Sequence, residues 1–349
     1  MTWPITNERA RPCTRFSFVA ASSHSMSSDP RVAMFLGRLQ KNETRLLPWR
    51  RRERVDCYRA YDKDIPELPL AVDVFRGDDD AALMVTGWAP RHGGGLAFTQ
   101  LVTACGLAAA ELLGVSPEAV FTQVREPGRG GELDADDVDA SAREITVNEG
   151  GGRFLLRVGA RRDPGLFLDH RSTRKFVADD VKGRRLLNLF AYTGSFSVLA
   201  GLAGAKSTLS VDLSLATCRW AETNLQRNGL TGPAHQVIAT DALAFLDDAD
   251  DDVGPFDVIV IDPPSFSKSR RANTTFEVQR DHPRLITSAL ARLALGGVIW
   301  FSCNLREFRF EDDRFEKHAI DVDNVTTKTT PPDFRGTPHH CFRIQKQRR

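Results

Sequence analysis

The sequence predicts an α/β protein in which a doubly wound, mainly parallel sheet follows a smaller amino-terminal α+β domain. From about residue 185 onward, short apolar runs alternate with helical patterns, which is typical of a parallel sheet with both faces covered. Before about residue 165 the strand patterns are short, alternate in polarity and are separated by turn residues, which indicates antiparallel pairing. A glycine turn or an aspartate follows each of four successive apolar runs. We therefore expect two domains, with a ligand site in the second.

The first 165 residues are expected to hold a leader and an accessory domain. Residues 1–26 mix arginine, serine and aromatic residues without the apolar core of a signal peptide, so we expect a disordered leader, with a transit-like targeting segment as the alternative. Residues 27–165 then form the α+β domain. Its predicted elements are an exposed helix at 31–46 with the basic tail RRRER, strands at 68–75 and 81–88, a helix at 98–114, strands at 119–126, 143–150 and 152–159, and an acidic loop at 132–139.

Residues 166–349 are expected to form the doubly wound domain. The predicted strands lie at 185–190, 207–212, 235–240, 257–262 and 297–302, and the predicted helices start at about 195 and cover 216–228, 242–246 and 283–293. The longest apolar stretch, LITSALARLALGGVIWFS, contains Arg292 and the pair Gly296-Gly297. It therefore predicts a helix, a turn and a strand instead of a membrane span.

Composition and charge restrict the function classes. Forty-seven basic and 46 acidic residues give a net charge of +1, so no global attraction for nucleic acid is expected and any RNA contact must be local. The six cysteines are scattered, without a C-x-x-C pair or a His/Cys cluster. This pattern predicts reduced thiols in the cytoplasm and no metal site. We expect a cytoplasmic protein with no membrane partner.

The residues that follow the strands predict a methyl donor as cofactor. A nicotinamide dinucleotide is the first alternative, but the turn NLFAYTGSFS has Gly194 where pyrophosphate binding needs three glycines, and Phe190 and Tyr192 would crowd the phosphates. S-adenosylmethionine fits better, with Asp212 accepting from the ribose hydroxyls and Asp241 from the adenine amino group. For Asp241 the alternative is an ordinary helix N-cap. The expected cofactor site comprises Asn188, Phe190, Tyr192, Thr193, Gly194, Asp212, Asp241 and Asp262.

The stretch IDPPSFSKSRR, at 261–271, carries the expected catalytic residues Asp262, Pro263, Pro264 and Phe266. The carboxylate of Asp262 can accept from the methionine ammonium or a substrate amine, and the two prolines prevent the chain from continuing as a strand. Phe266 is then free to stack on a planar base. The alternative is a tight turn with Phe266 packed in the core.

Several segments resemble bacterial 23S rRNA methyltransferases, in particular the methyltransferase K half of the large-subunit K/L enzyme. They are LLNLFAYTGSFSVLAGLAGAKSTLSVDLS, WAETNLQRNGL, FDVIVIDPPSFSKSRR and FEVQRDH, with further matches in CYRAYDKDIPELPLAVDVF, QVREPGRGGE, GLFLDHR and TTKTTPPDFRGTPHHCFRI. The resemblance covers about residues 31–345. It implies a class I, Rossmann-like methyltransferase that uses S-adenosylmethionine to methylate N7 of a guanine. The implied partner is 23S rRNA or a large-subunit precursor.

Two departures from the K/L pattern affect the expected function. The THUMP domain and the guanine-N2 methyltransferase half of the fusion are not matched, so we expect a stand-alone K-type protein. Cys303, in FSCNLREF, stands where K-type enzymes carry asparagine. A thiolate there suggests the alternative of a cytosine-C5 methyltransferase, although a buried structural cysteine explains Cys303 equally simply. A catalytically silent RNA-binding or ribosome-assembly factor and a small-molecule methyltransferase are the remaining alternatives.

Basic residues near the expected site predict where RNA phosphates bind. One group follows Phe266, and a second lies in FLDHRSTRK just before the first strand of the doubly wound domain. Because lone surface charges are common, we assign phosphate binding to these groups and not to individual residues. Their members are Lys268, Arg270, Arg271 and Arg280, and Arg171, Arg174 and Lys175.

Overall fold

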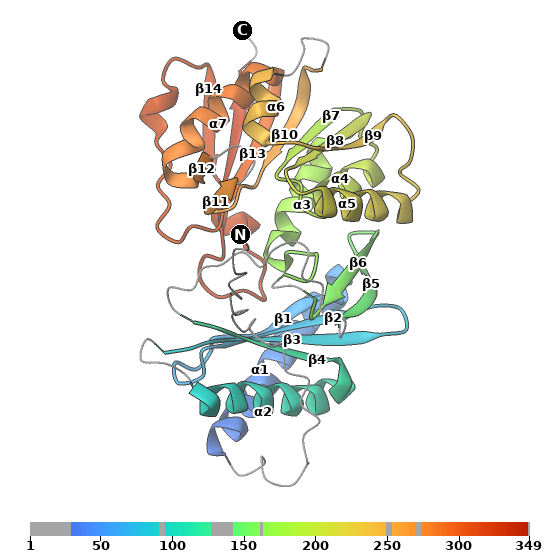
Figure 1. The fold of residues 1–349 in the computed structure, drawn as a ribbon, viewed down its shortest axis with the longest axis vertical. Helices are drawn as coiled ribbons and strands as arrows, with labels where there is room; N and C mark the ends of the chain where they lie inside the picture. Colours follow the sequence, from blue (N-terminus) through green and yellow to red (C-terminus); the bar gives the residue numbers. More distant parts are fainter. Residues whose placement is uncertain are drawn as a thin grey trace, which may run out of the picture.

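The computed structural model describes residues 29–90, 95–126, 142–160, 163–248, 253–269 and 274–347. The described residues form two lobes, each built on one sheet (Figure 1). The expected leader and the acidic loop at 132–139 lie outside the described residues. Both sheets have the predicted character, so the α/β fold class with a smaller α+β part is confirmed.

The lobe drawn at the bottom of Figure 1 packs two helices on one four-stranded sheet. Its strand order is β1-β2-β3-β4, with β1, β2 and β3 antiparallel and β4 parallel to β3. The elements are α1 (Pro30–Glu53), β1 (Tyr58–Asp62), β2 (Leu70–Arg76), β3 (Ala81–Trp88), α2 (Gly95–Leu113), the 3-10 turn η1 (Pro117–Ala119) and β4 (Val120–Arg125).

Helix α1 corrects the expectation of an exposed helix. Asp29 caps its amino end by accepting from the backbone N–H of Arg31, and the helix continues through the basic tail to Glu53. Apolar residues at three- and four-residue spacing turn one face inward, and Phe35 and Leu39 are fully buried. The pattern in the sequence was therefore that of a core helix, with its basic residues on the outer face.

Helix α2 has the length and composition of a membrane span, which no other helix of the described residues has. It packs against α1, β3 and β4, and Phe98, Leu101 and Cys105 on its inner face are buried. A core helix of a globular lobe has the same apolar character. The helix therefore needs no membrane to cover its inner face.

A hairpin lies between the two lobes (Figure 1). It consists of β5 (Arg143–Glu149) and β6 (Gly152–Val158), and it contacts β2 and β3 on one side and α4 and α5 on the other. Leu155 in β6 is held at both backbone groups: its N–H donates to Asn224 Oδ1 at 2.9 Å and its carbonyl accepts from Trp220 Nε1 at 2.9 Å. These bonds attach the hairpin to the upper lobe.

The upper lobe is a seven-stranded sheet of order β14-β15-β13-β10-β7-β8-β9. The five strands from β13 to β9 are parallel, and β15 runs antiparallel to β13 and β14. The strands are β7 (Arg185–Leu189), β8 (Ser207–Asp212), β9 (His235–Ala239), β10 (Phe256–Ile261), β13 (Leu293–Cys303), β14 (Ile320–Asn324) and β15 (His340–Lys346). The helices and turns are η2 (Leu168–His170), α3 (Arg171–Asp180), α4 (Ser195–Leu202), α5 (Leu215–Arg227), α6 (Ala242–Asp248), α7 (Val278–Arg292), η3 (Asp312–Phe315) and α8 (Thr326–Thr329).

Both faces of this sheet are covered, as the unbroken apolar runs predict. In β10 the buried residues Ile259 and Ile261 belong to the core beneath α6 and α7, whereas Val258 and Val260 belong to the core beneath α3 and α4. Side chains of a strand alternate between faces, so one strand supplies both cores. The carboxyl ends of the central strands lie at the edge of the sheet that faces the lower lobe in Figure 1.

Several elements differ from the sequence prediction. Gly296 and Gly297 lie inside β13 where its register with β10 shifts, so they form an irregularity of the strand instead of a turn. A Cβ at Gly297 would stand 2.9 Å from the carbonyl oxygen of Asp257, which explains the glycine. The stretch after Asp262 forms a small antiparallel hairpin of β11 (Phe266–Ser269) and β12 (Thr274–Glu277). Strands β14 and β15 and helix α3 were not predicted.

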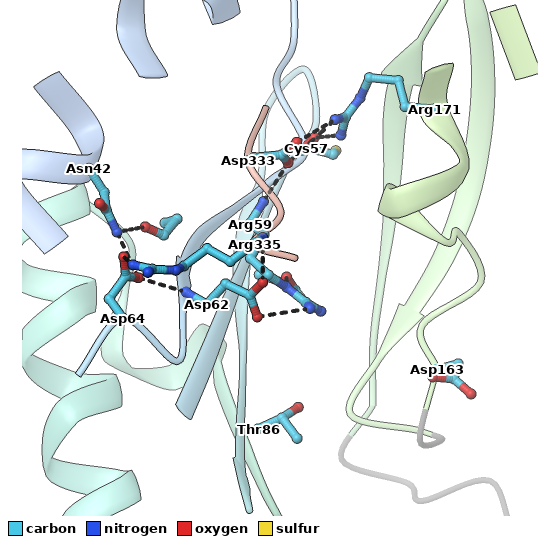
Figure 2. A network of polar contacts seen from close by, with 12 residues as sticks. Asn42, Cys57, Arg59, Asp62, Asp64, Thr86, Asp163, Arg171, Asp333 and Arg335 are labelled. Carbon is cyan, nitrogen blue, oxygen red and sulfur yellow. Dashed lines mark hydrogen bonds and ion pairs between the residues drawn. The ribbon is translucent and has the colours of Figure 1, made fainter. Parts of the chain in front are cut away.

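A polar network joins the segment at 331–336, which precedes β15, to the lower lobe (Figure 2). Asp333 accepts from the backbone N–H of Arg59 at 2.9 Å and pairs with Arg171. The backbone N–H of Arg335 donates to Asp62 at 2.8 Å, and its guanidinium pairs with Asp64 at 2.9 Å. The carboxyl-terminal part of the chain is thereby attached to β1 and the loop after it.

Candidate active site

The turn after β7 has an unusual backbone conformation. Phe190, Tyr192 and Gly194 have φ angles of 55°, 49° and 77°, in the left-handed region. Non-glycine residues rarely adopt this region, and strained backbone of this kind clusters at functional sites. A Cβ at Gly194 would stand 3.0 Å from the Cβ of Ala221, so the close approach of α5 adds a second reason for glycine. The turn ends at the amino end of α4.

Asp212 fixes this turn from the end of the neighbouring strand. Its Oδ2 accepts from the backbone N–H of Tyr192 at 2.9 Å and its Oδ1 from Ser214 at 3.0 Å. Burial raises the pKa of this carboxyl group above its ordinary value. Each carboxylate oxygen retains one lone pair for a donor such as a ribose hydroxyl. The apolar side chain of Leu213 beside it is 42% exposed and offers a surface for a planar ring.

Two side chains predicted to bind the cofactor, those of Asn188 and Thr193, make hydrogen bonds inside the protein instead. The amide of Asn188 is buried and donates to Ser197 Oγ at 3.0 Å. The hydroxyl of Thr193 is fully buried and donates to the carbonyl of Gly165 at 2.6 Å. These side chains hold the strand and the turn in place, so the prediction that they bind the cofactor does not fit their burial. The sequence spacing does not identify Ser197 or Gly165 as the hydrogen-bond partner of these side chains.

Asp241 caps α6, as the simpler alternative predicted. Its Oδ1 accepts from the backbone N–H groups of Leu243 and Ala244, both at 3.0 Å. These are the amino-terminal donors that a helix leaves unpaired. The contact with adenine stays a prediction.

Asp262 lies at the end of β10 with both carboxylate oxygens close to donors. Ser302 Oγ donates to Oδ1 at 2.7 Å, and His170 Nε2 lies 3.4 Å from Oδ2. The side chain of Asp262 is 22% exposed, so an incoming ligand can still reach it. Pro263 is buried and Pro264 is exposed.

Phe266 begins β11 and is 47% exposed. The alternative in which this ring is packed in the core is therefore wrong. An exposed phenylalanine four residues after Asp262 is compatible with stacking on a base, because about half of its surface is in contact with solvent.

The family model for S-adenosylmethionine-dependent methyltransferases matches residues 119–336 of this chain. The chain belongs to this methyltransferase family. It is 36% identical to ribosomal RNA large subunit methyltransferase K of Neisseria meningitidis, over 90% of this chain and 87% of that protein. It is 39% identical to methyltransferase K/L of Shewanella loihica and 40% identical to that of Allochromatium vinosum, over 87% and 90% of this chain. It spans 42% and 43% of the length of those two relatives.

The fold of the methyltransferase also matches solved structures. The crystal structure of the methyltransferase SMU.776 complexed with SAH aligns with a TM-score of 0.72 at 22% identity, covering 90% of this chain and 81% of that chain. The turn lacks the glycines of a pyrophosphate site, and the contact of Asp212 with a ribose stays a prediction. Because the chain belongs to the S-adenosylmethionine-dependent family, S-adenosylmethionine is the cofactor of this methyltransferase.

The two predicted phosphate-binding groups have different outcomes. Arg174 is 1% exposed and pairs with Glu149 at 2.5 Å, and Arg171 pairs with Glu149 at 3.2 Å and with Asp333 at 3.3 Å. Figure 2 shows Arg171 reaching Asp333 and the carbonyl of Cys57. The predicted phosphate contacts of Arg171 and Arg174 do not fit this arrangement, because both guanidinium groups neutralise buried carboxylates. These ion pairs could not be predicted from the sequence, since the partners of the two arginines are distant in the chain.

The other predicted cations are placed differently. Lys175 is 70% exposed and lies 3.5 Å from Glu53, and Arg280 is 54% exposed and pairs with Asp281 at 2.7 Å. These exposed pairs are weak and can exchange a carboxylate for a phosphate. Lys268 lies on β11. Arg270 and Arg271 lie outside the described residues.

Cys303 is the last residue of β13 and is fully buried. Burial raises the pKa of its thiol to about 12, so the thiolate needed for addition to cytosine C6 is absent at neutral pH. The structural alternative accounts for this residue better than the cytosine-C5 alternative.

We expect Cys303→Ala to keep the methyl-transfer rate within about threefold of wild type, because a buried thiol is replaced by a smaller apolar group. Labelled methyl transfer to rRNA measures this. Cys341, a buried cysteine on the adjacent strand β15, provides the matched control as Cys341→Ala. A loss of transfer confined to Cys303→Ala would restore the cytosine-C5 alternative.

Two histidines and an aspartate beside Asp262 were missed by the sequence analysis. His170 and His339 are buried and their rings stack at a centroid distance of 4.3 Å, with Asp169 Oδ2 3.2 Å from His339 Nδ1. The segments GLFLDHR and TPHHCFRI entered the analysis as parts of the resemblance. Nothing in their spacing indicates that they meet, because 169 positions separate the histidines.

Proposed function

We propose that this methyltransferase transfers the methyl group of S-adenosylmethionine to a base of large-subunit ribosomal RNA, namely N7 of a guanine in 23S rRNA. The observation that carries the proposal is the exposed ring of Phe266, four residues after the partly buried carboxylate of Asp262. The relatives are named as ribosomal RNA large subunit methyltransferases, and these names support large-subunit rRNA as the substrate class. The proposed partner is 23S rRNA or its precursor particle, and the proposed location is the cytoplasm.

The reaction requires placement more than proton transfer. Guanine N7 carries a lone pair that attacks the sulfonium methyl group, so the N7–carbon bond forms as the sulfur–carbon bond breaks and a neutral thioether leaves. Alignment of these atoms supplies most of the rate. The ring acquires positive charge during the transfer, and the carboxylate of Asp262 stabilises it.

The base must leave its stack before it can react. The major groove of an RNA helix is too deep and narrow for side chains to reach N7, so the target is opened or flipped out. Phe266 then provides a face on which the extruded base stacks. The exposed Arg280 and Lys175 are proposed to contact flanking phosphates. Arg280 lies in α7, directly after the β11–β12 hairpin that begins with Phe266.

Phe266→Ala is expected to lower kcat/KM for RNA by about 5- to 100-fold, because base stacking on an aromatic ring contributes roughly 1–3 kcal/mol. The dissociation constant of S-adenosylmethionine should not change. Steady-state methyl transfer and calorimetry of donor binding measure the two effects.

The controls are Phe266→Trp, which keeps a stacking surface, and Phe176→Ala, which removes another half-exposed phenylalanine on α3. Both should retain most of the activity. Unchanged kcat/KM in Phe266→Ala would refute a stacking role for this ring.

The proposed substrate is tested by incubating the protein and labelled S-adenosylmethionine with unmodified 23S rRNA, 16S rRNA and a precursor large subunit in parallel. Label in 23S rRNA or in the particle supports the proposal. Donor binding without label in any RNA would favour a catalytically silent RNA-binding factor or a small-molecule methyltransferase.

A further inference from the structure

A buried hydrogen-bonded cluster adjoins Asp262 and has no part in the function so far. Its members are His170, from the turn η2, His339, just before β15, and Asp169. Pairing of β13 with β15 places Ser302 opposite Cys341, two residues after His339. The carboxylate of Asp262 therefore has Ser302 on one oxygen and His170, from the cluster, beside the other.

The partners of His170 indicate which ring nitrogen carries a proton. Nε2 lies 3.4 Å from Oδ2 of Asp262 and 3.9 Å from Oδ2 of Asp169, and both of these atoms are acceptors. Nδ1 is buried and has no hydrogen-bond partner among the described residues. A proton on Nδ1 would be buried without an acceptor and would leave the lone pair of Nε2 facing two carboxylate oxygens, whereas a proton on Nε2 faces both of these acceptors. The arrangement favours a proton on Nε2.

The charge state of His170 follows from its surroundings. Burial lowers the pKa of this imidazole below its ordinary value, against the opposing effect of Asp262 and Asp169. His339 and Arg174 also disfavour a positive charge on the ring. Phe196 covers its edge at a centroid distance of 5.9 Å. A neutral ring fits a site enclosed in this way.

His339 holds His170 in place. Its Nδ1 lies 3.2 Å from Asp169 Oδ2 and its Nε2 lies 3.1 Å from Thr329 Oγ1, so both nitrogens have partners. Its ring stacks on that of His170 with an interplanar angle of 20°. The ring of His170 is therefore fixed by stacking, and Asp169 by a hydrogen bond.

The same three side chains offer ligand atoms within 4.8 Å of one another, which is close enough for a metal ion. Two features favour a proton-bearing cluster. Both nitrogens of His339 are engaged in hydrogen bonds. The two rings also stack nearly parallel, so their in-plane lone pairs lie in separate planes instead of converging on one point.

We propose that His170 is a positioning residue for Asp262: its neutral ring directs the Nε2 proton toward Oδ2 of the carboxylate, 3.4 Å away, while Ser302 donates a hydrogen bond to Oδ1. With a donor group beside each oxygen, rotation of the carboxylate is restrained. The kinetic consequence rests on the proposed methyl transfer to RNA, whereas the protonation pattern of the ring does not.

The protonation pattern is tested by a long-range nitrogen–proton correlation spectrum of protein labelled with ¹⁵N-histidine, in which His170 is assigned by its loss in His170→Gln. We expect a protonated Nε2 and an unprotonated Nδ1 at neutral pH. A proton on Nδ1 or on both nitrogens would overturn the proposal. Addition of Zn²⁺ should leave the signals unchanged, and a joint shift of His170 and His339 would identify the cluster as a metal site and overturn it as well.

The positioning role is tested by kinetics. His170→Leu is expected to lower kcat about 10- to 100-fold, the effect of losing one hydrogen bond to a charged group, with an unchanged dissociation constant for S-adenosylmethionine. His170→Gln should stay within about threefold of wild type, because its amide nitrogen can occupy the place of imidazole Nε2. His235→Leu, at the amino end of the outer strand β9, is the control and should retain full activity.

Equal loss in His170→Gln and His170→Leu would show that the ring acts through packing, and wild-type kcat in His170→Leu would show that it does not act on Asp262. If His170→Leu does not fold, His170→Gln and the spectrum still decide. No transfer by the wild-type protein would contradict the proposed function, and the spectrum would then test His170 independently.

Discussion

Asp262→Ala is expected to lower kcat for methyl transfer about 100- to 1000-fold, the effect of removing a preorganised group that stabilises transition-state charge. The carboxylate lies at the end of β10, accepts a hydrogen bond from Ser302 on one oxygen and has His170 Nε2 3.4 Å from the other, so it needs little reorganisation to meet the developing charge. Single-turnover methyl transfer with labelled donor measures the chemical step. Asp247→Asn, which changes an exposed carboxylate on α6, serves as the control and should retain full activity.

Thermal unfolding distinguishes loss of the catalytic carboxylate from loss of the folded structure. The melting temperature of Asp262→Ala should stay near that of wild type, because the side chain is partly exposed and pairs with neutral donors. Full activity in a folded Asp262→Ala protein would refute the role of this carboxylate. It would leave placement of the base as the whole source of the rate.

Glu149→Gln is expected to lower the free energy of unfolding by about 3–5 kcal/mol, because it removes one partner of a buried ion pair. Glu149 ends β5 and pairs with both Arg171 and Arg174, whose side chains are 12% and 1% exposed. Asp333 supplies the second negative charge, so the four groups are balanced in wild type. The substitution leaves one buried positive charge without compensation. Urea unfolding at neutral pH measures the change.

Glu53→Gln is the matched control for this prediction. It changes an acid of the same type, whose partner Lys175 lies 3.5 Å away on the surface. Exposed pairs contribute little to stability, so this variant should unfold near the wild-type urea concentration. Equal stability of Glu149→Gln and wild type would show that the cluster links the lobes without stabilising them.

Much of the fold could be predicted from local patterns in the sequence. The apolar residues VIVI identified β10, because a strand buried on both faces needs no polar alternation, and the shorter apolar segments of β7 and β8 were recognised from their alternation with helices. The acids and the glycine turn after these runs led to Asp212 and Asp262, since parallel strands bring their carboxyl ends to one edge. Long-range contacts produce no local sequence pattern of this kind.

The missed features share one physical cause. Arg174 looked like a surface cation because its partner, Glu149, lies 25 positions away on a hairpin. His170 meets His339 across 169 positions, and β15 joins β13 antiparallel and pairs with β14 at the edge of the sheet. Such contacts depend on the tertiary structure, so the periodicity of a short sequence segment does not predict them. Burial of a charge can be predicted from the sequence only when its partner is known.

The central claim, methyl transfer to guanine N7, is tested most directly by chemical cleavage of the product. Unmodified 23S rRNA is incubated with the protein and S-adenosylmethionine and then treated with borohydride and aniline, which cut at N7-methylguanine. We predict one new cleavage at a single guanine, which is absent with Asp262→Ala. Methyl groups incorporated into the RNA without any new cleavage would contradict the assignment to N7.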